Sequence, residues 1–215
     1  MPVFTENYLS IRAQLDAQNV TLVAVSKTRP PEDILVLYEL GQRDFGENYV
    51  QEFLAKQGSL PPDIRWHFIG HLQTNKVKQI AGLVHLIHGV DSWRLLAEIN
   101  KQGQKLNRAI GCLLQVHIAQ EETKFGLDET ELKQVFQQLP SLPFVQVRGL
   151  MGMASNTSDT ARVRKEFAHL KKLADDLSFT DSPIISMGMS NDYALAVEEG
   201  STLVRIGSLL FGARN

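Results

Sequence analysis

The chain has 215 residues, of which 43% are hydrophobic and 21% charged, and its 22 basic and 24 acidic side chains give a formal net charge of −2. This near-neutral mixture is ordinary for a globular protein and gives no sign of a nucleic-acid or membrane partner. The single cysteine, Cys112, has no partner for an internal disulfide, and neither a membrane span nor a signal peptide is evident. We therefore expect a soluble protein of the reducing cytoplasm.

The first predicted elements place a lysine at the end of a strand. Residues 3–18 are predicted to form an amphipathic helix, and the apolar, β-branched run of residues 21–27 a strand buried on both faces. That run ends in Lys27, and the prolines and acidic residues after it predict the first turn of a helix. A lysine in apolar surroundings has a lowered pKa and can attack carbonyl groups. The alternative is that Lys27 simply extends its ammonium group to water.

Strand-like and helix-like segments alternate through the rest of the chain. The eight predicted strands are residues 21–27, 44–47, 65–70, 86–90, 111–118, 145–151, 183–189 and 203–207. After the leading helix, the predicted helices are residues 32–40, 49–57, 73–81, 92–103, 128–138, 159–177 and 190–199. Such alternation predicts a parallel sheet. Eight repeats predict a closed (β/α)8 barrel, one domain over residues 1–215, with its chemistry at the carboxyl ends of the strands.

The middle of the chain contains further candidates. Asn48 follows the second strand and opens the next helix, where capping is the usual role and ligand contact the alternative. Four histidines occur near the third and fourth strands, namely His67, His71, His85 and His88. Their spacing does not place a ligand set on one strand face, so we expect no metal site. Lys124, in the loop after the fifth strand, lies on the same rim as Lys27 and is a candidate second amine.

Polar residues also follow the last two strands. Ser190 comes after the seventh strand and begins the next helix, and Gly207-Ser208 closes the eighth. In barrels, the loops after strands seven and eight commonly bind phosphate, with glycine allowing close backbone approach and hydroxyl groups donating. The alternative is a helix cap and a bent strand. Arg205 lies within an apolar strand, so it needs a partner, which could be an acidic side chain or a ligand atom.

Specific short motifs are spread almost from end to end of the chain. They are residues 25–28, 45–52, 66–70, 72–76, 148–151, 186–190 and 204–208, with Phe211-Gly212. Together they resemble the pyridoxal phosphate homeostasis protein family, in a bacterial or cyanobacterial form. The resemblance implies a single TIM barrel like the N-terminal domain of alanine racemase, the third fold type of such proteins. It also implies that pyridoxal 5'-phosphate (PLP) is held as a lysine aldimine.

The resemblance also implies a role for each candidate residue. The implied cofactor site consists of Lys27, Asn48, Ser190, Arg205, Gly207 and Ser208. In it, Lys27 forms the Schiff base, Arg205 faces the pyridine nitrogen, and the two serines and the glycine hold the phosphate. Ser208 stands where the family often has threonine, which keeps the hydroxyl group. Lys124 matches a lysine often found in the family's loop.

The expected function is PLP binding for intracellular vitamin B6 and amino-acid homeostasis, without robust catalysis and without catalytic residues of its own. Because arginine only donates, a pyridine nitrogen facing Arg205 stays unprotonated, and the ring is then a poor electron sink. PLP-dependent apo-enzymes are candidate recipients. The alternatives are an amino-acid racemase of the alanine racemase type and a Schiff-base aldolase. Because the chain ends at Asn215, directly after the eighth strand, we expect no second racemase domain, and a monomer.

Overall fold

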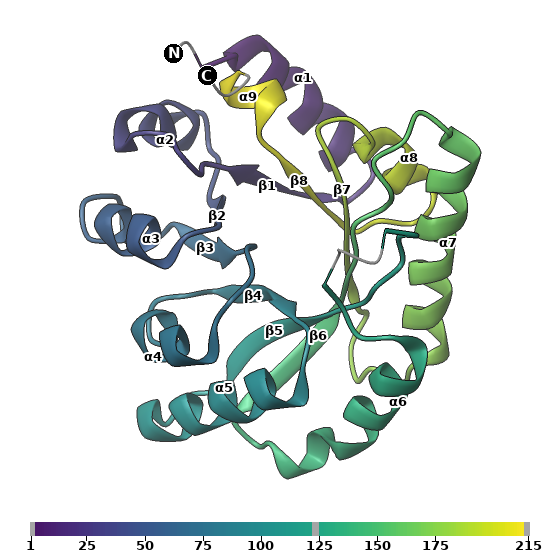
Figure 1. Cartoon of the computed structure of the whole chain (residues 1–215). Coiled ribbons are helices and arrows are strands. Elements are labelled where there is room, and N and C mark those ends of the chain that lie inside the picture. The colour runs from purple at the N-terminus through teal and green to yellow at the C-terminus, as the bar shows by residue number, and fades with distance from the viewer. Residues whose placement is uncertain (1–2, 122–124, 213–215) are drawn as a thin grey trace.

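Eight parallel strands close into a barrel in chain order, and β8 pairs with β1, in the computed structural model of the chain (Figure 1). The structure describes residues 3–121 and 125–212. The strands are β1 (Thr21–Val25), β2 (Asp44–Glu47), β3 (Arg65–Phe68), β4 (Leu86–Val90), β5 (Ile110–Gln115), β6 (Val145–Met151), β7 (Ile184–Met189) and β8 (Leu203–Ile206). The predicted barrel is therefore confirmed.

Helices form a ring around the barrel (Figure 1). They are α1 (Thr5–Asp16), α2 (Pro31–Glu39), α3 (Val50–Gln57), α4 (Val77–Ile80), α5 (Trp93–Leu106), α6 (Glu129–Gln138), α7 (Thr160–Asp176), α8 (Tyr193–Glu198) and α9 (Ser208–Phe211), with 3-10 turns at Thr74–Lys76 and Leu139–Ser141. The apolar faces of these helices pack on the strands and form the main core. None of the helices in the described ranges is both long and apolar enough to cross a membrane.

The predicted elements differ from the observed ones mainly at their ends. β1 ends at Val25 rather than at Lys27, because the chain turns immediately after Ser26. The helix predicted over residues 73–81 is a 3-10 turn followed by the four-residue α4. The short helix α9 was not predicted, because a single turn has too few residues to show a periodic pattern.

Closure of the barrel joins the two ends of the chain. β1 pairs with β8 in a register that places Val23 opposite Arg205. Outside this seam, α1 and α9 lie side by side (Figure 1), and the backbone N–H of Phe4 donates to the carbonyl of Leu210 at 2.8 Å. The residues that follow β1 and those that follow β8 therefore meet at one edge of the barrel.

Candidate functional site

A cavity of about 670 Å³ lies at the carboxyl ends of the strands. All the residues predicted to bind the cofactor line it, namely Lys27, Asn48, Ser190, Arg205, Gly207 and Ser208. They come from the segments around the ends of β1, β2, β7 and β8, which the register of the closed barrel brings together. The candidate second amine, Lys124, lies outside the described residues.

The turn that carries Lys27 is held from both sides by α3. The Nζ of Lys56 donates to the carbonyl of Ser26 at 2.8 Å, and the backbone N–H of Thr28 donates to Glu52. Lys56 and Glu52 also pair with each other at 2.6 Å, one helical turn apart. Thr28 has a φ of 64°, an uncommon conformation for a β-branched residue. Such strain persists only where surrounding contacts impose it, so α3 holds the backbone on either side of Lys27 in place.

A buried carboxylate supports this clamp. Glu47, at the end of β2, accepts from the Nζ of Lys56 at 2.8 Å and from the hydroxyl of Ser26 at 2.7 Å. Burial raises the pKa of Glu47, while the hydrogen bonds from Lys56 and Ser26 act against that rise. The sequence analysis missed this group, and the only local signal was the spacing of Glu52 and Lys56 on one face of α3.

Asn48 does not cap a helix, so the usual role expected for it is wrong. The residue that precedes α3 is Tyr49, and no side chain caps this helix. The buried Oδ1 of Asn48 has no hydrogen-bond partner among the described residues. Buried polar atoms are nearly always paired. The Oδ1 of Asn48 is therefore an acceptor on the cavity wall that receives no hydrogen bond from the described protein groups.

Ser190 does not cap a helix, so the alternative considered for it is not found. The helix that follows β7 begins at Tyr193, after Asp192, and Ser190 lies in the loop before it. Its hydroxyl oxygen accepts from the backbone N–H of Gly207 at 3.2 Å. A hydroxyl that accepts one hydrogen bond can still donate its own proton. Ser190 can therefore donate into the cavity while it ties the β7 loop to the end of β8.

Close packing favours glycine at position 207. A Cβ atom there would lie 3.3 Å from both the carbonyl oxygen and the Cβ of Val25. The absence of a side chain lets the ends of β1 and β8 approach each other. Ser208, the next residue, is exposed and begins α9 on the cavity wall. The two serines and the backbone of Gly207 thus form one polar corner of the cavity.

Arg205 is buried, and its partners are oxygen atoms of the barrel wall. Its Nη1 donates to the carbonyl of Ser186 at 2.8 Å and to the hydroxyl of Ser186 at 2.6 Å, and its Nη2 donates to the carbonyl of Gly152 at 3.3 Å. Within the described ranges it forms no ion pair, so the structural ion pair considered above is not found there. Burial lowers the pKa of Arg205 to about 10, which leaves it charged near neutral pH. These three hydrogen bonds leave the N–H of Nε and one N–H of Nη2 unused, and Arg205 lines the cavity.

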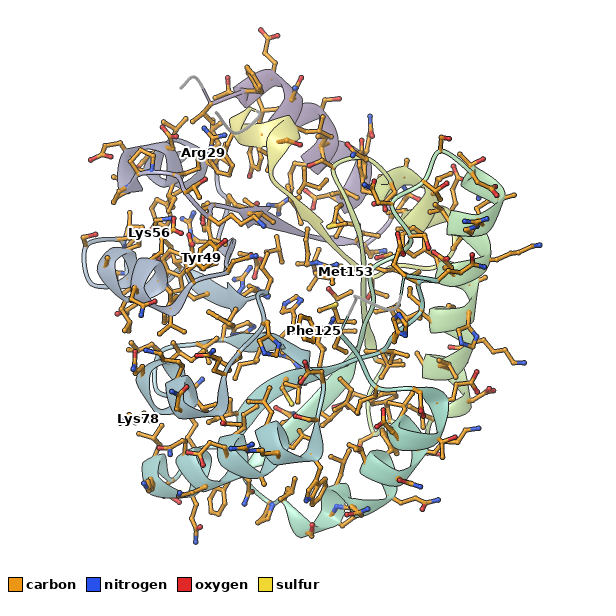
Figure 2. All side chains as sticks on the ribbon, viewed as in Figure 1. Arg29, Tyr49, Lys56, Lys78, Phe125 and Met153 are labelled. Carbon is orange, nitrogen blue, oxygen red and sulfur yellow. The ribbon has the colours of Figure 1, made fainter. Side chains whose placement is uncertain are left out.

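The wall that follows β6 was not among the predicted site segments. Residues 153–158 line the cavity, and Met153 lies near the centre of the barrel in Figure 2. Within this wall, the buried Glu166 of α7 accepts from the backbone N–H of Ser155 at 2.6 Å and from its hydroxyl at 2.7 Å. The available signal was the polar run Ser155-Asn156-Thr157-Ser158 just beyond a strand. Such runs at the carboxyl edge of a barrel are typical of ligand-binding loops.

No cluster of histidine, cysteine and acidic side chains in the described part of the chain could hold a metal ion. Cys112 is buried within β5, and burial raises the pKa of its thiol to about 12. The expectation that it is a small buried hydrophobic residue is therefore confirmed. Neither metal coordination nor a cysteine nucleophile is suggested by the described residues.

Comparison with known proteins identifies similar chains. The family model for the alanine racemase N-terminal domain matches residues 3–215. A pyridoxal phosphate homeostasis protein from Aquifex aeolicus is 46% identical over 197 residues, which cover 90% of this chain and 86% of that protein.

Solved structures extend the comparison. PipY of Synechococcus elongatus, solved with PLP bound, has a TM-score of 0.87 and 39% identity, covering 96% of this chain and 99% of PipY. Alanine racemase from Bartonella henselae has a TM-score of 0.79 at 18% identity, and the match covers 98% of this chain and 60% of the racemase. The likeness to the racemase is therefore one of fold alone.

Proposed function

The chain belongs to the pyridoxal phosphate homeostasis protein family, and we propose that its cavity binds PLP and that the protein serves PLP (vitamin B6) homeostasis. When bound, PLP supplies an aldehyde that condenses with an amine, and a phosphate group that carries negative charge. The close relatives are named as homeostasis proteins and not as enzymes. The protein accordingly holds the cofactor without robust turnover.

The proposed roles follow from the chemistry of the cavity wall. Lys27 provides the amine, on a turn that α3 clamps. Ser190 and Ser208 donate hydroxyl hydrogen bonds to the phosphate, next to the side-chain-free backbone of Gly207. Arg205 directs its remaining N–H groups toward the pyridine nitrogen, which must then accept.

The residues that line the cavity match the functional groups of PLP. A carbonyl carbon needs an amine, a phosphate needs donors, and a pyridine nitrogen needs a donor if it is to stay unprotonated. The cavity wall has a residue for each of these needs. The orphaned Oδ1 of Asn48 adds an acceptor that the described protein groups leave unused. The observation that carries the proposal is that Lys27, the serine corner and Arg205 line the same cavity although they follow different strands.

The test is the spectrum and the trapped adduct of the purified protein after addition of PLP. We expect a visible absorption band, and after borohydride reduction a stable adduct that peptide mapping places on Lys27. Lys27→Ala should lose this adduct and remain folded. The matched control is Lys78→Ala, because Lys78 is exposed on α4 and lies at the outer edge of the molecule, away from Met153 (Figure 2). An adduct mapped to another lysine in the unaltered protein would refute the assignment.

Beyond binding, the proposal includes transfer of PLP to apo-enzymes by a monomeric cytoplasmic protein. Two neighbouring features support a carrier: the cavity lies at the carboxyl edge of the barrel, and the half-buried Lys27 sits on a turn rather than inside a strand. Lys124 is proposed as a second amine during entry and exit. Mixing the PLP-loaded protein with an apo-enzyme tests transfer. A rate of enzyme activation no faster than with the same concentration of free PLP would count against the carrier role.

A further inference from the structure

Behind Arg205, a line of polar side chains crosses the interior of the barrel. The hydroxyl of Ser186 lies 3.0 Å from Nδ1 of His88, whose Nε2 lies 2.9 Å from Nδ1 of His67. Nε2 of His67 lies 3.0 Å from Oδ1 of Asp44. We name Asp44, His67, His88 and Ser186 the interior chain. Its members come from β2, β3, β4 and β7, and all are buried.

The interior chain connects two cavities. At one end, the hydroxyl of Ser186 accepts from Arg205, which lines the candidate site. At the other end, Asp44 lines a smaller cavity of about 270 Å³ at the amino ends of the strands, together with Arg65. Arg65 donates through Nε to Asp44 at 2.7 Å. The charged ends of the interior chain are therefore Asp44 and, through Ser186, Arg205.

The donors and acceptors of this chain can be ordered from their chemistry. Although burial opposes it, the hydrogen bonds from His67 and Arg65 hold the pKa of Asp44 well below its usual value, so Asp44 is an ionised acceptor. His67 must then donate from Nε2 and, when neutral, accept at Nδ1. That requires His88 to donate from Nε2 and to accept at Nδ1 from Ser186. The oxygen of Ser186 accepts from Arg205, so every bond points from Arg205 toward Asp44.

The reverse order leaves one hydrogen without an acceptor. If Nδ1 of His88 carried the proton, the oxygen of Ser186 would receive two donors and its own hydrogen would need a third partner. Within the described residues, Ser186 Oγ makes no third hydrogen bond. Burial lowers the pKa of His88 well below its usual value, and the nearby charge of Arg205 acts in the same direction. Both the geometry and the environment therefore favour a neutral His88 with its proton on Nε2.

This order has an electrostatic consequence. Arg205 is a buried cation that forms no direct salt bridge in the described ranges, which is costly unless other groups compensate. The charge of Asp192, on the same cavity wall, acts on Arg205 without a direct contact and offsets only part of the burial. Each imidazole of the interior chain turns its lone pair toward Arg205 and its N–H toward Asp44. Aligned hydrogen bonds polarise one another, so the dipoles stabilise both end charges at once.

We propose that the interior chain is a positioning element that acts as the remote counter-charge of Arg205 and fixes the direction of the N–H groups that Arg205 presents to the cavity. The consequence is selectivity for a ligand ring with an acceptor nitrogen. This consequence rests on the proposed function, because PLP is the ligand whose ring nitrogen Arg205 would meet. The proton order along the interior chain does not depend on any ligand.

The ligand test compares PLP with its deaza analogue, in which a C–H group replaces the ring nitrogen. The unaltered protein should bind PLP more tightly than the analogue. Ser186→Ala removes the hydroxyl that joins His88 to Arg205 but keeps the backbone carbonyl that Arg205 also uses. It should reduce the preference for PLP about tenfold, the effect of one hydrogen bond to a charged group, and leave affinity for the analogue unchanged. Asp44→Asn should act in the same direction.

Ser201→Ala is the matched control for the removal of a buried hydroxyl. Ser201 is also buried between β7 and β8, but its hydroxyl lies against the carbonyls of Ile185, Met187 and Leu203, outside the interior chain. Ser201→Ala should leave the preference for PLP over the deaza analogue unchanged. If Ser186→Ala weakens PLP and the analogue equally, the interior chain is merely structural and the proposal is wrong. If the unaltered protein binds neither ligand, the proposed function fails, and the ligand-free measurement decides the proton order.

That measurement is long-range proton–nitrogen NMR of the histidine side chains in the cofactor-free protein. At a pH where the rings are neutral, both His67 and His88 should carry the proton on Nε2. Ser186→Ala should shift the Nδ1 resonance of His88 toward that of an unbonded acceptor, while Ser201→Ala should not. A proton on Nδ1 of either histidine in the unaltered protein would overturn the proposed order.

Discussion

The hydroxyl of Ser190 accepts a hydrogen bond from the backbone N–H of Gly207 at 3.2 Å. This contact ties the loop after β7 to the end of β8, where Ser208 adds a second hydroxyl group. The two loops are thus one polar corner, and a ligand phosphate placed there would meet donors from both.

Replacing both serines tests the phosphate assignment. In the Ser190→Ala, Ser208→Ala double variant, each lost hydrogen bond to a charged phosphate should cost about 1.5–3 kcal/mol of PLP binding. Affinity for pyridoxal, which has no phosphate, should change little. Titration of both ligands by fluorescence or absorbance measures the difference. Ser92→Ala, which removes the cap of α5 away from the cavity, is the control. Equal weakening of both ligands would show that the serines only support the loops.

The clamp behind Lys27 makes a second prediction. Glu52→Gln removes the negative charge that pairs with Lys56 and leaves a weaker, neutral acceptor for the N–H of Thr28. Since Thr28 holds an unfavourable backbone conformation that costs of order 1–3 kcal/mol, weakening of these contacts should let the turn relax. We expect the fraction of protein trapped as a Lys27 adduct at limiting PLP to fall about tenfold. Glu39→Gln, on the exposed surface of α2, should leave that fraction unchanged, and an unchanged fraction in Glu52→Gln itself would exclude the clamp.

Because His88 is buried, we expect the free energy of unfolding to depend on pH. Burial, with the nearby charge of Arg205, lowers its pKa in the folded protein, whereas in the unfolded chain it titrates near about 6.5. Below that pH the unfolded state binds more protons, so the free energy of unfolding should fall by up to about 1.4 kcal/mol per pH unit from this residue. Urea unfolding at a series of pH values between about 7 and 5 measures the slope.

The control for that slope is the His88→Gln variant, which keeps a donor and an acceptor but does not titrate in this range. It should show a smaller slope than the unaltered protein. His169→Gln, at a half-exposed position of α7 where Nε2 lies 3.3 Å from Glu129, removes a histidine that is not fully buried and should keep most of the slope. If the slope is the same with and without His88, the residue is not held neutral in the folded protein.

Cys112 should be unreactive in the native protein. It is completely buried in β5, and burial raises the pKa of its thiol to about 12, so the reactive thiolate is both scarce and inaccessible. An aromatic disulfide reagent should label Cys112 only after the protein unfolds, and the labelling rate should follow denaturant concentration. Rapid labelling without denaturant would show that the barrel opens locally around β5.

The sequence by itself determined the elements and their order. The strands at residues 86–90 and 145–151 have the bounds that the sequence predicts, although His88 lies within the first and Gln146 and Arg148 within the second. A parallel barrel has one edge where strands end, so chain order alone predicted that Lys27 and Gly207-Ser208 would share a rim. That prediction needed no contact information, because each strand end is a local feature.

Only the tertiary structure decided what those residues touch. Asn48 and Ser190 are of residue types that are typical of helix caps, yet neither caps a helix. Whether such a residue lies at the cap or in the preceding loop depends on where the backbone turns into the helix. The interior chain was beyond the sequence analysis for a different reason. Ser186 and His88 are 98 positions apart, and the stagger of a closed barrel sets which inward-facing residues meet. The local sequence of each strand indicates which of its residues are buried. The hydrogen-bond partners across the barrel are defined only when all eight strands have closed.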